Sequence, residues 1–388
     1  MELANIRIKE HFGLVTNDTN TAQFNFLVSP PKNRETIEKQ DIICFDHPIY
    51  GDACQVLAEV KEITSYEEVA GSTIGGSIGK LLATAQVFGY VDLRQEDKPL
   101  RKLLTPPNPG SRVYMPYAAF LQDTLNRGPE GKTAKQPLLL GKAAIFAASQ
   151  NSGSQQVNCY LSAAELTGKH TLISAVDGAG KTYTATILIE ELANKTNHTI
   201  VILDPNNEYS ALGAVSQRNE DYPFKFETAI VNSNSKMSQD LVEKIRANQV
   251  TILTAENLSL AERNDYYANV LTALVRARRE KVLQPLLIVV EDAENLPPKV
   301  IEEVVSMKDG VAAVLVSSHP MLLGGKTLSK VGNQIVGKTT DLQDLAILKN
   351  MIGGSDEQMW SLGVGEWVVN GLNVVRPMKI HIRERFSK

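Results

Sequence analysis

The stretch that decides the fold is residues 170–186, which read HTLISAVDGAGKTYTAT. It opens as a short apolar run, breaks into a loop of small residues and ends in Gly180-Lys181-Thr182, where a helical pattern begins. This is the strand, loop and helix order of a phosphate-binding loop. Glycines at 178 and 180 let backbone N–H groups approach a phosphate closely, and the helix that follows adds its unpaired N–H groups and positive dipole end. The stretch therefore predicts a nucleotide site in an α/β domain.

The loop offers a residue for each part of ATP with Mg²⁺. Lys181 is expected to reach the outer phosphates as a mobile cation, and the Thr182 hydroxyl is a fitting Mg²⁺ ligand. Tyr183 either packs near the nucleotide or is buried in the core. Ala175 stands where the motif Gly-x-x-x-x-Gly-Lys-Thr has its first glycine, so a residue with a β-carbon must turn the chain into the loop. The nucleotide-binding residues predicted here are Asp177, Gly178, Ala179, Gly180, Lys181, Thr182 and Tyr183.

Length and composition indicate a large folded protein. The chain has 388 residues, 43% hydrophobic and 22% charged, and we expect two or three domains because single cores stop growing at about 250–300 residues. A net charge of −4 excludes a globally basic nucleic-acid binder but allows a local positive lining. The three cysteines show no metal-binding spacing, which favours a reducing compartment. Without a leader-like start or an apolar run near the ~20 residues of a membrane helix, we expect a cytoplasmic protein with no membrane partner.

The first third of the chain is predicted to be β-rich. Short apolar runs alternate with Asn, Asp, Gly and Pro clusters, as in a small barrel or sandwich. Residues 104–110 contain too much proline for a strand or helix interior and form a turn or packing strap. Residues 138–142 and 156–161 give the last strands, so the N-terminal β-barrel domain is expected to span 1–161. The other predicted strands are residues 12–15, 23–28, 41–45, 55–60, 83–91 and 111–115.

From residue 170 onward, strand and helix patterns alternate. Helices are expected at 185–192 and 258–281, and nearly all-apolar strands at 199–203, 250–253, 286–290 and 311–316. Such strands interleaved with helices predict a parallel sheet covered on both faces. Near the end, Trp367 and Asn370-Gly371 fit a hairpin with a tight turn, a structural role that we favour over base stacking.

A second group of chemically informative residues follows the predicted strand 286–290. In a nucleotide hydrolase, a carboxylate at the tip of such a strand holds the Mg²⁺ hydration shell and its neighbour orients the attacking water. Glu291 and Asp292 take these places, Glu291 as metal ligand and Asp292 as base. Asp204 and Glu208 follow another strand and are expected to support Mg²⁺ or the water, although a turn role for Asp204 is an alternative. Acidic residues at strand ends also bind only water in many proteins, and it is the upstream loop that favours the functional interpretation.

The order of these segments resembles the HerA-type ATPases of the HerA/FtsK superfamily, which are hexameric DNA translocases. The resemblance implies a RecA-like P-loop core over 162–355, a HAS-barrel-like N-terminal domain and a C-terminal hairpin or strap over 356–388. It also implies ATP, Mg²⁺, double-stranded DNA, a homo-hexamer and a NurA-like nuclease as partner in DNA-end processing. The residues that carry it are 12–15, 85–91, 105–111, 140–141, 178–182, 204–209, 291–292, 317–320 and 365–377.

Several positions depart from the family pattern. The family has Gly at Ala175, Glu at Asp292 and His at Glu294. It has Ser-Gln-Arg-Pro where this chain has Ser-Ser-His-Pro at 317–320, and Arg-Lys where this chain has Met-Lys at 307–308. The resemblance thus places Ser318 and Lys308 at two catalytic positions. Ser318 lacks the amide that would sense the γ-phosphate, and a lysine is a point charge rather than a bidentate fork.

Two classes of function remain open. One is an ATP-driven translocase or helicase that contacts the duplex backbone without sequence preference. The other is an ATP-binding, ring-forming structural or regulatory subunit with weak hydrolysis, and a specialised mover for viral packaging or anti-phage defence is a variant of the theme. Arg276, Arg278 and Arg279 either face DNA or a neighbouring subunit, or are simply solvated.

Overall fold

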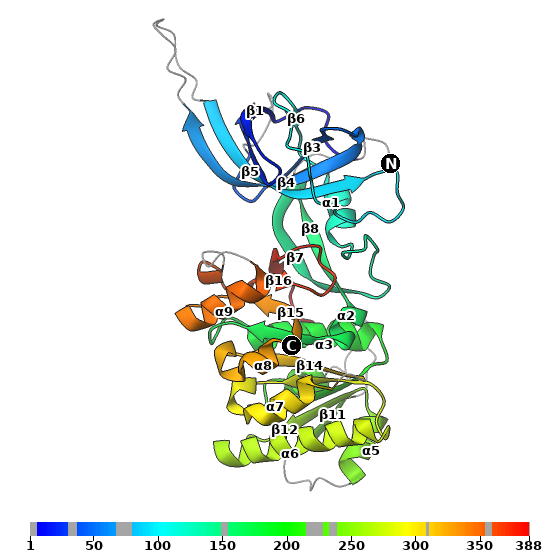
Figure 1. Cartoon of the computed structure of the whole chain (residues 1–388). Helices are drawn as coiled ribbons and strands as arrows, with labels where there is room; N and C mark the ends of the chain where they lie inside the picture. The colour runs from blue at the N-terminus through cyan, green and yellow to red at the C-terminus, as the bar shows by residue number, and fades with distance from the viewer. Residues whose placement is uncertain are drawn as a thin grey trace, which may run out of the picture. The chain divides into compact units, whose positions relative to one another are not determined.

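The computed structural model describes residues 6–29, 37–66, 80–148, 154–214, 228–232, 239–307, 310–353 and 359–387. The chain divides into two compact units (Figure 1), the first made of Met1–Thr133 with Ala143–Cys159 and the second of Ala134–Lys142 with Tyr160–Lys388. Residues 134–142 therefore belong to the second unit, although the N-terminal domain was expected to span 1–161. The reason is that strand β7 (Pro137–Ala148) begins beside the end of the chain, where the Leu140 carbonyl accepts the Arg383 N–H at 3.0 Å.

The first unit is a six-stranded antiparallel sheet in the order β3-β4-β5-β2-β1-β6. An antiparallel bridge between Cys44 and Tyr114, with N–H to O distances of 2.8 Å in both directions, joins its two edges and nearly closes the sheet. Phe24, Phe26 and Phe45 lie in its core. The short helix α1 (Ala118–Leu125) was not predicted. The strands are β1 Gly13–Thr19, β2 Gln23–Val28, β3 Ile42–His47, β4 Gly51–Tyr66, β5 Lys80–Asp92 and β6 Arg112–Val113.

The second unit contains most of a mixed sheet in the order β11-β12-β10-β13-β14-β9-β15-β16-β17-β7-β8, in which residues 143–159 of the last two strands belong to the first unit. The strands from β11 to β15 are parallel, as predicted, whereas β16 and β17 pair antiparallel with their neighbours. The expectation of a parallel sheet therefore holds for the strands from β11 to β15. The strands are β8 Ser154–Ser162, β9 His170–Ser174, β10 Thr199–Asp204, β11 Thr228–Asn232, β12 Val250–Thr254, β13 Leu286–Val290, β14 Val311–Ser317, β15 Val331–Val336, β16 Glu366–Asn370 and β17 Met378–Ile382.

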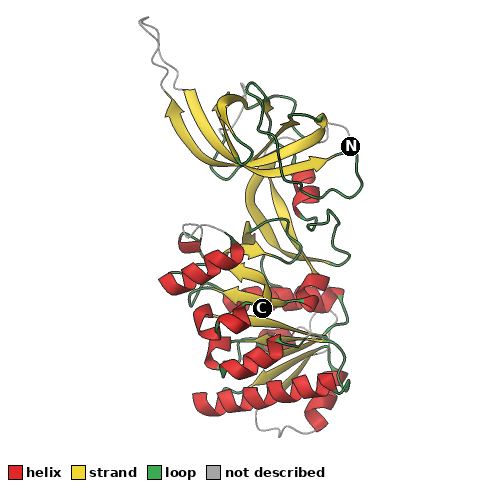
Figure 2. Ribbon diagram, viewed as in Figure 1, coloured by secondary structure: helices red, strands yellow, loops and turns green. Residues whose placement is uncertain are grey.

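Helices pack against the strands of the second unit (Figure 2). Helices α6 and α7 share one buried apolar cluster with alternate residues of β10, β13 and β14, while α3 contacts β9, β10 and β14 outside that cluster. No described helix has both the length and the apolar character to cross a membrane. The helices are α2 Ala163–Gly168, α3 Lys181–Lys195, α4 Ser210–Ala214, α5 Gln239–Ala247, α6 Leu260–Arg279, α7 Pro298–Val305, α8 Gly325–Leu328 and α9 Leu342–Ile352, with 3-10 turns η3 Ala293–Asn295 and η4 Pro320–Leu323.

Local sequence explains where the helices begin. Helix α6 starts at a capping box, in which the Ser259 hydroxyl accepts the Glu262 N–H and the Glu262 carboxylate accepts the Ser259 N–H. Helix α3 starts directly after Gly180, whose φ of +96° is in the left-handed region. Because β9, β10, β13 and β14 are parallel, the residues that follow them meet at one edge of the sheet, and the loop before α3 lies there.

The turn into that loop is made by Ala175, the residue that replaces the first glycine of the motif. Ala175 is buried, and it lies opposite Gly337 at the end of β15. A β-carbon at Gly337 would come within 2.9 Å of both the Ala175 β-carbon and the Trp367 ring. Backbone bonds fix this contact on both sides, from the Gly337 N–H to the Ser174 carbonyl and from the Val176 N–H to the Lys338 carbonyl, each 2.8 Å long. The methyl group that the motif normally lacks is thus accommodated by a glycine on the neighbouring strand.

Replacing Gly337 with alanine should therefore lower the free energy of unfolding by about 1–3 kcal/mol, because the added methyl group overpacks this contact. Urea unfolding followed by circular dichroism measures the change. Gly325→Ala is the matched control, since nothing lies within 4 Å of the corresponding β-carbon in helix α8. Equal stability of the two variants would contradict this account of the loop entry.

Candidate functional site

The loop between β9 and α3 has the backbone form of an anion-binding site. Gly178 and Gly180 have φ values of +78° and +96°, and no atom lies within 4 Å of a β-carbon built on Gly178. The Thr184 N–H donates to the Gly180 carbonyl at 2.9 Å, so the helical bonding of α3 begins there. The N–H groups of the residues just before it belong to the open first turn of the helix, where they are suited to bind an anion.

Lys181 lies along this loop rather than facing solvent. Its residue is only 8% exposed, and its Nζ donates to Asp177 Oδ1 at 2.9 Å and to the Val176 carbonyl at 3.5 Å. The stem of Lys181 is covered, and its ammonium group is turned to the loop. Ser318, which follows β14, donates from its hydroxyl to the same Asp177 oxygen at 2.5 Å. These hydrogen bonds lower the pKa of Asp177, and the bond from Ser318 has the larger effect.

Thr182 joins the loop to two carboxylates from other strands. Its hydroxyl oxygen lies 2.6 Å from Glu208 Oε2 and 3.1 Å from Glu291 Oε1, and the Tyr209 hydroxyl donates to the other Glu291 oxygen. A hydroxyl has one proton to give, so both Thr182 contacts are hydrogen bonds only if one carboxyl carries a proton. Burial raises the pKa of Glu291 to about 8, against the hydrogen bond from Tyr209. Thr182 Oγ1 lies within donating distance of both carboxylates, and a proton on Glu291 below about pH 8 would allow both contacts to be hydrogen bonds.

Asp204 positions the neighbouring acidic residue. It is fully buried at the end of β10, and its two oxygens accept the N–H groups of Glu208 and Tyr209, each at 2.9 Å. Burial raises the pKa of Asp204. The structure thus gives Asp204 the turn role that the sequence left as an alternative, and it presents Glu208 and Tyr209 to Thr182 and Glu291.

Asp292 has a different environment from its neighbour Glu291. Its φ of +49° is in the left-handed region, and its side chain is half-buried, whereas Glu291 is buried. Asn206 Nδ2 donates to Asp292 Oδ2 at 3.2 Å, and Arg263 Nη1 donates to Asn206 Oδ1 at 3.2 Å. Burial raises the pKa of Asp292, which makes its carboxylate a better proton acceptor.

The residues around Thr182 fit Mg²⁺. A hydroxyl and two carboxylates converge, and hard oxygen ligands of this kind suit the ion. Mg²⁺ is commonly held by one or two carboxylates together with phosphate oxygens and water, so a larger acidic cluster is not required. The described residues contain no group of three or more His, Cys, Asp or Glu side chains that could hold a metal ion. Thr182, Glu208 and Glu291 would hold the ion, and its arrival would displace the proton of Glu291.

The remaining predicted residues are placed as follows. Lys308 lies outside the described residues. Tyr183 accepts the Arg385 N–H at 2.7 Å through its hydroxyl, so it is engaged by the end of the chain. The sequence did not single out Tyr209, Asn206 or Arg263, because nothing in their spacing shows that they bond to the acidic residues of the site.

The arginine cluster on α6 has partners within the chain. Arg276 pairs with Glu280 at 2.8 Å and Arg279 pairs with Glu303 at 3.2 Å. Arg278 donates to the Leu283 carbonyl at 3.2 Å. The Arg276 and Arg279 side chains nevertheless remain 78% and 58% exposed, so these surface pairs contribute little to stability.

The strand, loop and helix with acidic residues at the ends of adjacent parallel strands define a P-loop NTPase domain. Residues 148–299 match the protein family described as "Helicase HerA, central domain". A curated relative, the probable DNA double-strand break repair helicase HerA of Methanocaldococcus jannaschii, is 41% identical over 56 residues, which are 14% of this chain and 11% of the relative's length. The resemblance of the chain to HerA-type P-loop ATPases is thereby confirmed.

Solved structures with detectable likeness include a viral genome packaging NTPase and VirB4. The genome packaging NTPase B204 of Sulfolobus turreted icosahedral virus 2, in complex with AMPPCP, is 15% identical with a TM-score of 0.40, over 55% of this chain and 97% of that one. VirB4 of Thermoanaerobacter pseudethanolicus is 11% identical with a TM-score of 0.48, over 66% of this chain and 98% of that one.

The contact between Lys181 and Asp177 leads to a prediction about affinity. A phosphate must draw Lys181 away from Asp177, whose side chain is 89% exposed, so the competing ion pair is worth little. Asp177→Asn should therefore tighten binding of a fluorescent ATP analogue by about two- to fivefold in equilibrium titrations. Asp265→Asn, the same charge change at an exposed position of α6, is the control and should leave affinity unchanged. Unchanged or weaker binding by Asp177→Asn would show that Asp177 does not compete for Lys181.

The raised pKa of Glu291 leads to a prediction about pH. Below about 8 Glu291 holds a proton that Mg²⁺ must displace, so Mg²⁺ affinity should rise with pH, by up to about tenfold per unit, and level off above about pH 8. The free energy of unfolding should change in the opposite sense. Between the ordinary value of 4.5 and about 8 the folded state binds more protons than the unfolded state, so its stability falls as pH rises.

Mg²⁺ titrations and urea unfolding across this range measure both slopes. Glu291→Gln cannot titrate and should flatten both, while Asp265→Asn should retain them. A Mg²⁺ affinity that is independent of pH in the unmodified protein would remove Glu291 from the metal site.

Proposed function

We propose that this protein is an ATPase that uses hydrolysis to move double-stranded DNA. The observation that carries the proposal is the position of Thr182 between Glu208 and Glu291, one residue after Lys181 and beside Asp292. Catalysis by such a site rests on positioning and on electrostatic stabilisation of the transferred phosphoryl group. No other group of described residues combines a phosphate-binding loop with acidic strand ends in this way.

Each side chain has a defined part in the proposed reaction. Lys181 moves from Asp177 to the outer phosphates and balances their charge. Mg²⁺, when bound, supplies a second positive charge and orients the phosphates. Asp292, oriented by Asn206, holds the attacking water and accepts its proton, and its raised pKa suits that task. Ser318 donates to Asp177. Once Lys181 has moved, the Ser318 hydroxyl contacts the phosphates from the same side of the loop.

The coupling to DNA is proposed from the family match and from the name of the relative. On this basis the protein forms a homo-hexamer around the duplex, helped by a NurA-like nuclease in DNA-end processing. The nearly closed sheet of the first unit then serves as a HAS-barrel-like domain, and the β16–β17 hairpin within residues 356–388 extends the sheet of the core. Lys308, or an arginine from an adjacent subunit, supplies the charge that Met307 lacks.

A second candidate function is an ATP-binding, ring-forming structural or regulatory subunit with weak hydrolysis. Two contacts and one side-chain length favour it. Lys181 is already paired with Asp177, the Ser318 hydroxyl is engaged by the same carboxylate, and Asp292 is one methylene shorter than the glutamate of the family. A misplacement of about 1 Å in the group that orients water can cost ~10²-fold in rate.

Steady-state ATP turnover with and without linear duplex DNA distinguishes these functions. For a translocase, we expect DNA to stimulate turnover. Asp292→Asn should reduce turnover by about 10²-fold or more while ATP still binds, because it removes the proton acceptor but leaves the phosphate contacts. Lys181→Ala should abolish binding, and Asp265→Asn is the control. If turnover is weak, insensitive to DNA and unchanged in Asp292→Asn, the structural or regulatory subunit becomes the better description.

A further inference from the structure

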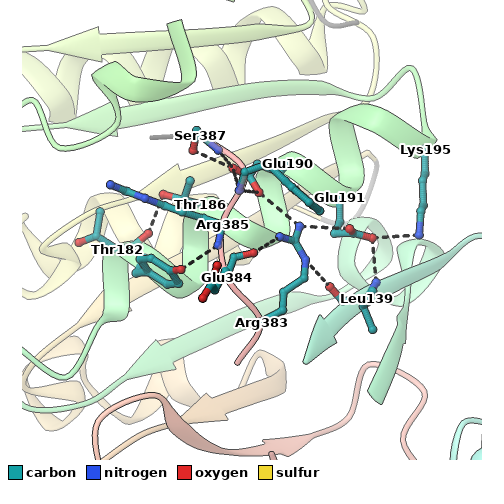
Figure 3. Close-up of polar contacts among 12 residues, drawn as sticks. Leu139, Thr182, Thr186, Glu190, Glu191, Lys195, Arg383, Glu384, Arg385 and Ser387 are labelled. Atoms are coloured by element: carbon teal, nitrogen blue, oxygen red, sulfur yellow. Dashed lines mark hydrogen bonds and ion pairs between the residues drawn. The ribbon is translucent and has the colours of Figure 1, made fainter. Parts of the chain in front are cut away.

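The segment after β17, Arg383–Ser387, lies along helix α3 (Figure 3) and is called the tail segment below. Glu190, in the middle of α3, is 1% exposed and accepts four bonds from this segment. The donors are the Phe386 N–H at 3.1 Å, the Ser387 N–H and hydroxyl at 2.7 Å each, and Arg383 Nη2 at 3.2 Å. A buried carboxylate with four donors from one segment is a specific attachment point, because without them its charge would be left uncompensated.

Arg383 extends the attachment to a second acidic residue. Its Nη2 also donates to Glu191 Oε1 at 3.1 Å, and its Nε donates to the Leu139 carbonyl at 3.1 Å. Lys195 pairs with the other Glu191 oxygen at 2.9 Å. The tail segment is thus tied to α3 and to β7 by directional, largely buried bonds, which set its register along the helix.

This register brings Arg385 to the first turn of α3. The Arg385 N–H donates to the Tyr183 hydroxyl at 2.7 Å, and the Arg385 guanidinium lies 5.3 Å from the centre of the Tyr183 ring. Figure 3 shows Arg385 within the tail segment that runs along α3. Both Arg385 and Tyr183 keep part of their surface exposed, so a ligand has access to them.

The first turn of the helix after a phosphate loop faces the inner phosphates of a nucleotide, while the loop lysine reaches the outer ones. We propose that Arg385 and Tyr183 form a clamp for the nucleoside side of the bound nucleotide, in which the guanidinium pairs with the innermost phosphate and stacks on the base. Arg suits this position because it is planar, always charged and able to do both. The inference rests on nucleotide binding by the proposed ATPase site. Glu190 is a positioning residue, since it acts only by holding the tail segment.

The clamp makes a distinctive prediction because ADP and ATP share the nucleoside and the innermost phosphate. Arg385→Ala in the full chain should weaken binding of fluorescent ADP and fluorescent ATPγS by the same factor, about tenfold. Arg385→Lys should retain part of the affinity, since it keeps the charge but not the fork. Glu384→Ala, an exposed position in the same segment, is the matched control and should bind both nucleotides normally.

Glu190→Gln tests the positioning role. It should weaken the binding of both nucleotides. Adding Arg385→Ala should cause little further loss of affinity, because both changes remove the same contact between Arg385 and the nucleotide. Thermal unfolding of each variant verifies that it is folded, and Ser387→Ala, which removes a single donor to Glu190, provides a milder version of the change. Additive losses in the double variant would show that Glu190 does not act through Arg385.

The outcomes separate this inference from the proposed function. If the unmodified protein binds both nucleotides and Arg385→Ala binds them equally well, the clamp is wrong and the ATPase proposal stands. If Arg385→Ala loses affinity for ATPγS but not for ADP, Arg385 contacts the outermost phosphate and the nucleoside-side clamp is wrong. If the unmodified protein binds neither nucleotide, both proposals fall.

Discussion

The buried carboxyl group of Glu291 is the constraint on which the rest of the site depends. It lies at the end of a fully buried strand, where an unpaired negative charge would be costly. The hydroxyl groups of Tyr209 and Thr182 contact it, and burial raises its pKa to about 8, so that it holds a proton below that pH. The arrangement is complete without a metal only while the proton is there. A divalent cation and that proton therefore compete for one position, and the position adjoins the residue that would bind the phosphates.

This constraint reaches further than the residues that touch Glu291. Tyr209 meets Glu291 because Asp204 fixes the turn that follows β10, and Asp204 is itself buried to do so. Helix α3 carries Thr182 at one end and the buried Glu190 in its middle, so the phosphate loop and the tail segment are attached to one rigid element. Because α3 is buried along much of its length, it holds the start of the helix, and the loop before it, in a fixed position.

The sequence predicted those parts of the fold that depend on local pattern. Strands such as β13 are all apolar because both faces of a central parallel strand are buried, and α6 ends within two residues of its predicted limits because of its capping box and basic last turn. Strand β15 was missed because Gly332, Asn333 and Gln334 interrupt its apolar pattern. Asn333 is nevertheless buried, where it donates to the Glu165 carbonyl and accepts the Leu372 N–H.

In the site, the sequence predicted which residue types gather but not how they pair. Loop spacing and strand ends brought Lys181, Thr182 and Glu291 together in advance. The sequence could not show that Asp177 bonds to Lys181 or that Asn206 bonds to Asp292, because these bonds depend on distances that only the packed structure sets. The tail segment was equally hidden. Its partner Glu190 looks in sequence like an ordinary polar helix residue, and only the covering segment makes it a buried attachment point.

The backbone at Asp292 gives a physical reason for the departure from the family at that position. Residues 291 and 292 are adjacent acids, yet one is buried against Thr182 and the other is half-exposed beside Asn206, and the left-handed conformation at Asp292 is what turns the chain between them. Among residues with a β-carbon, Asp and Asn tolerate this conformation best, since a short polar side chain can bond locally. A glutamate would reach further toward a bound phosphate but would fit this backbone less well. The shorter acid therefore belongs with the turn.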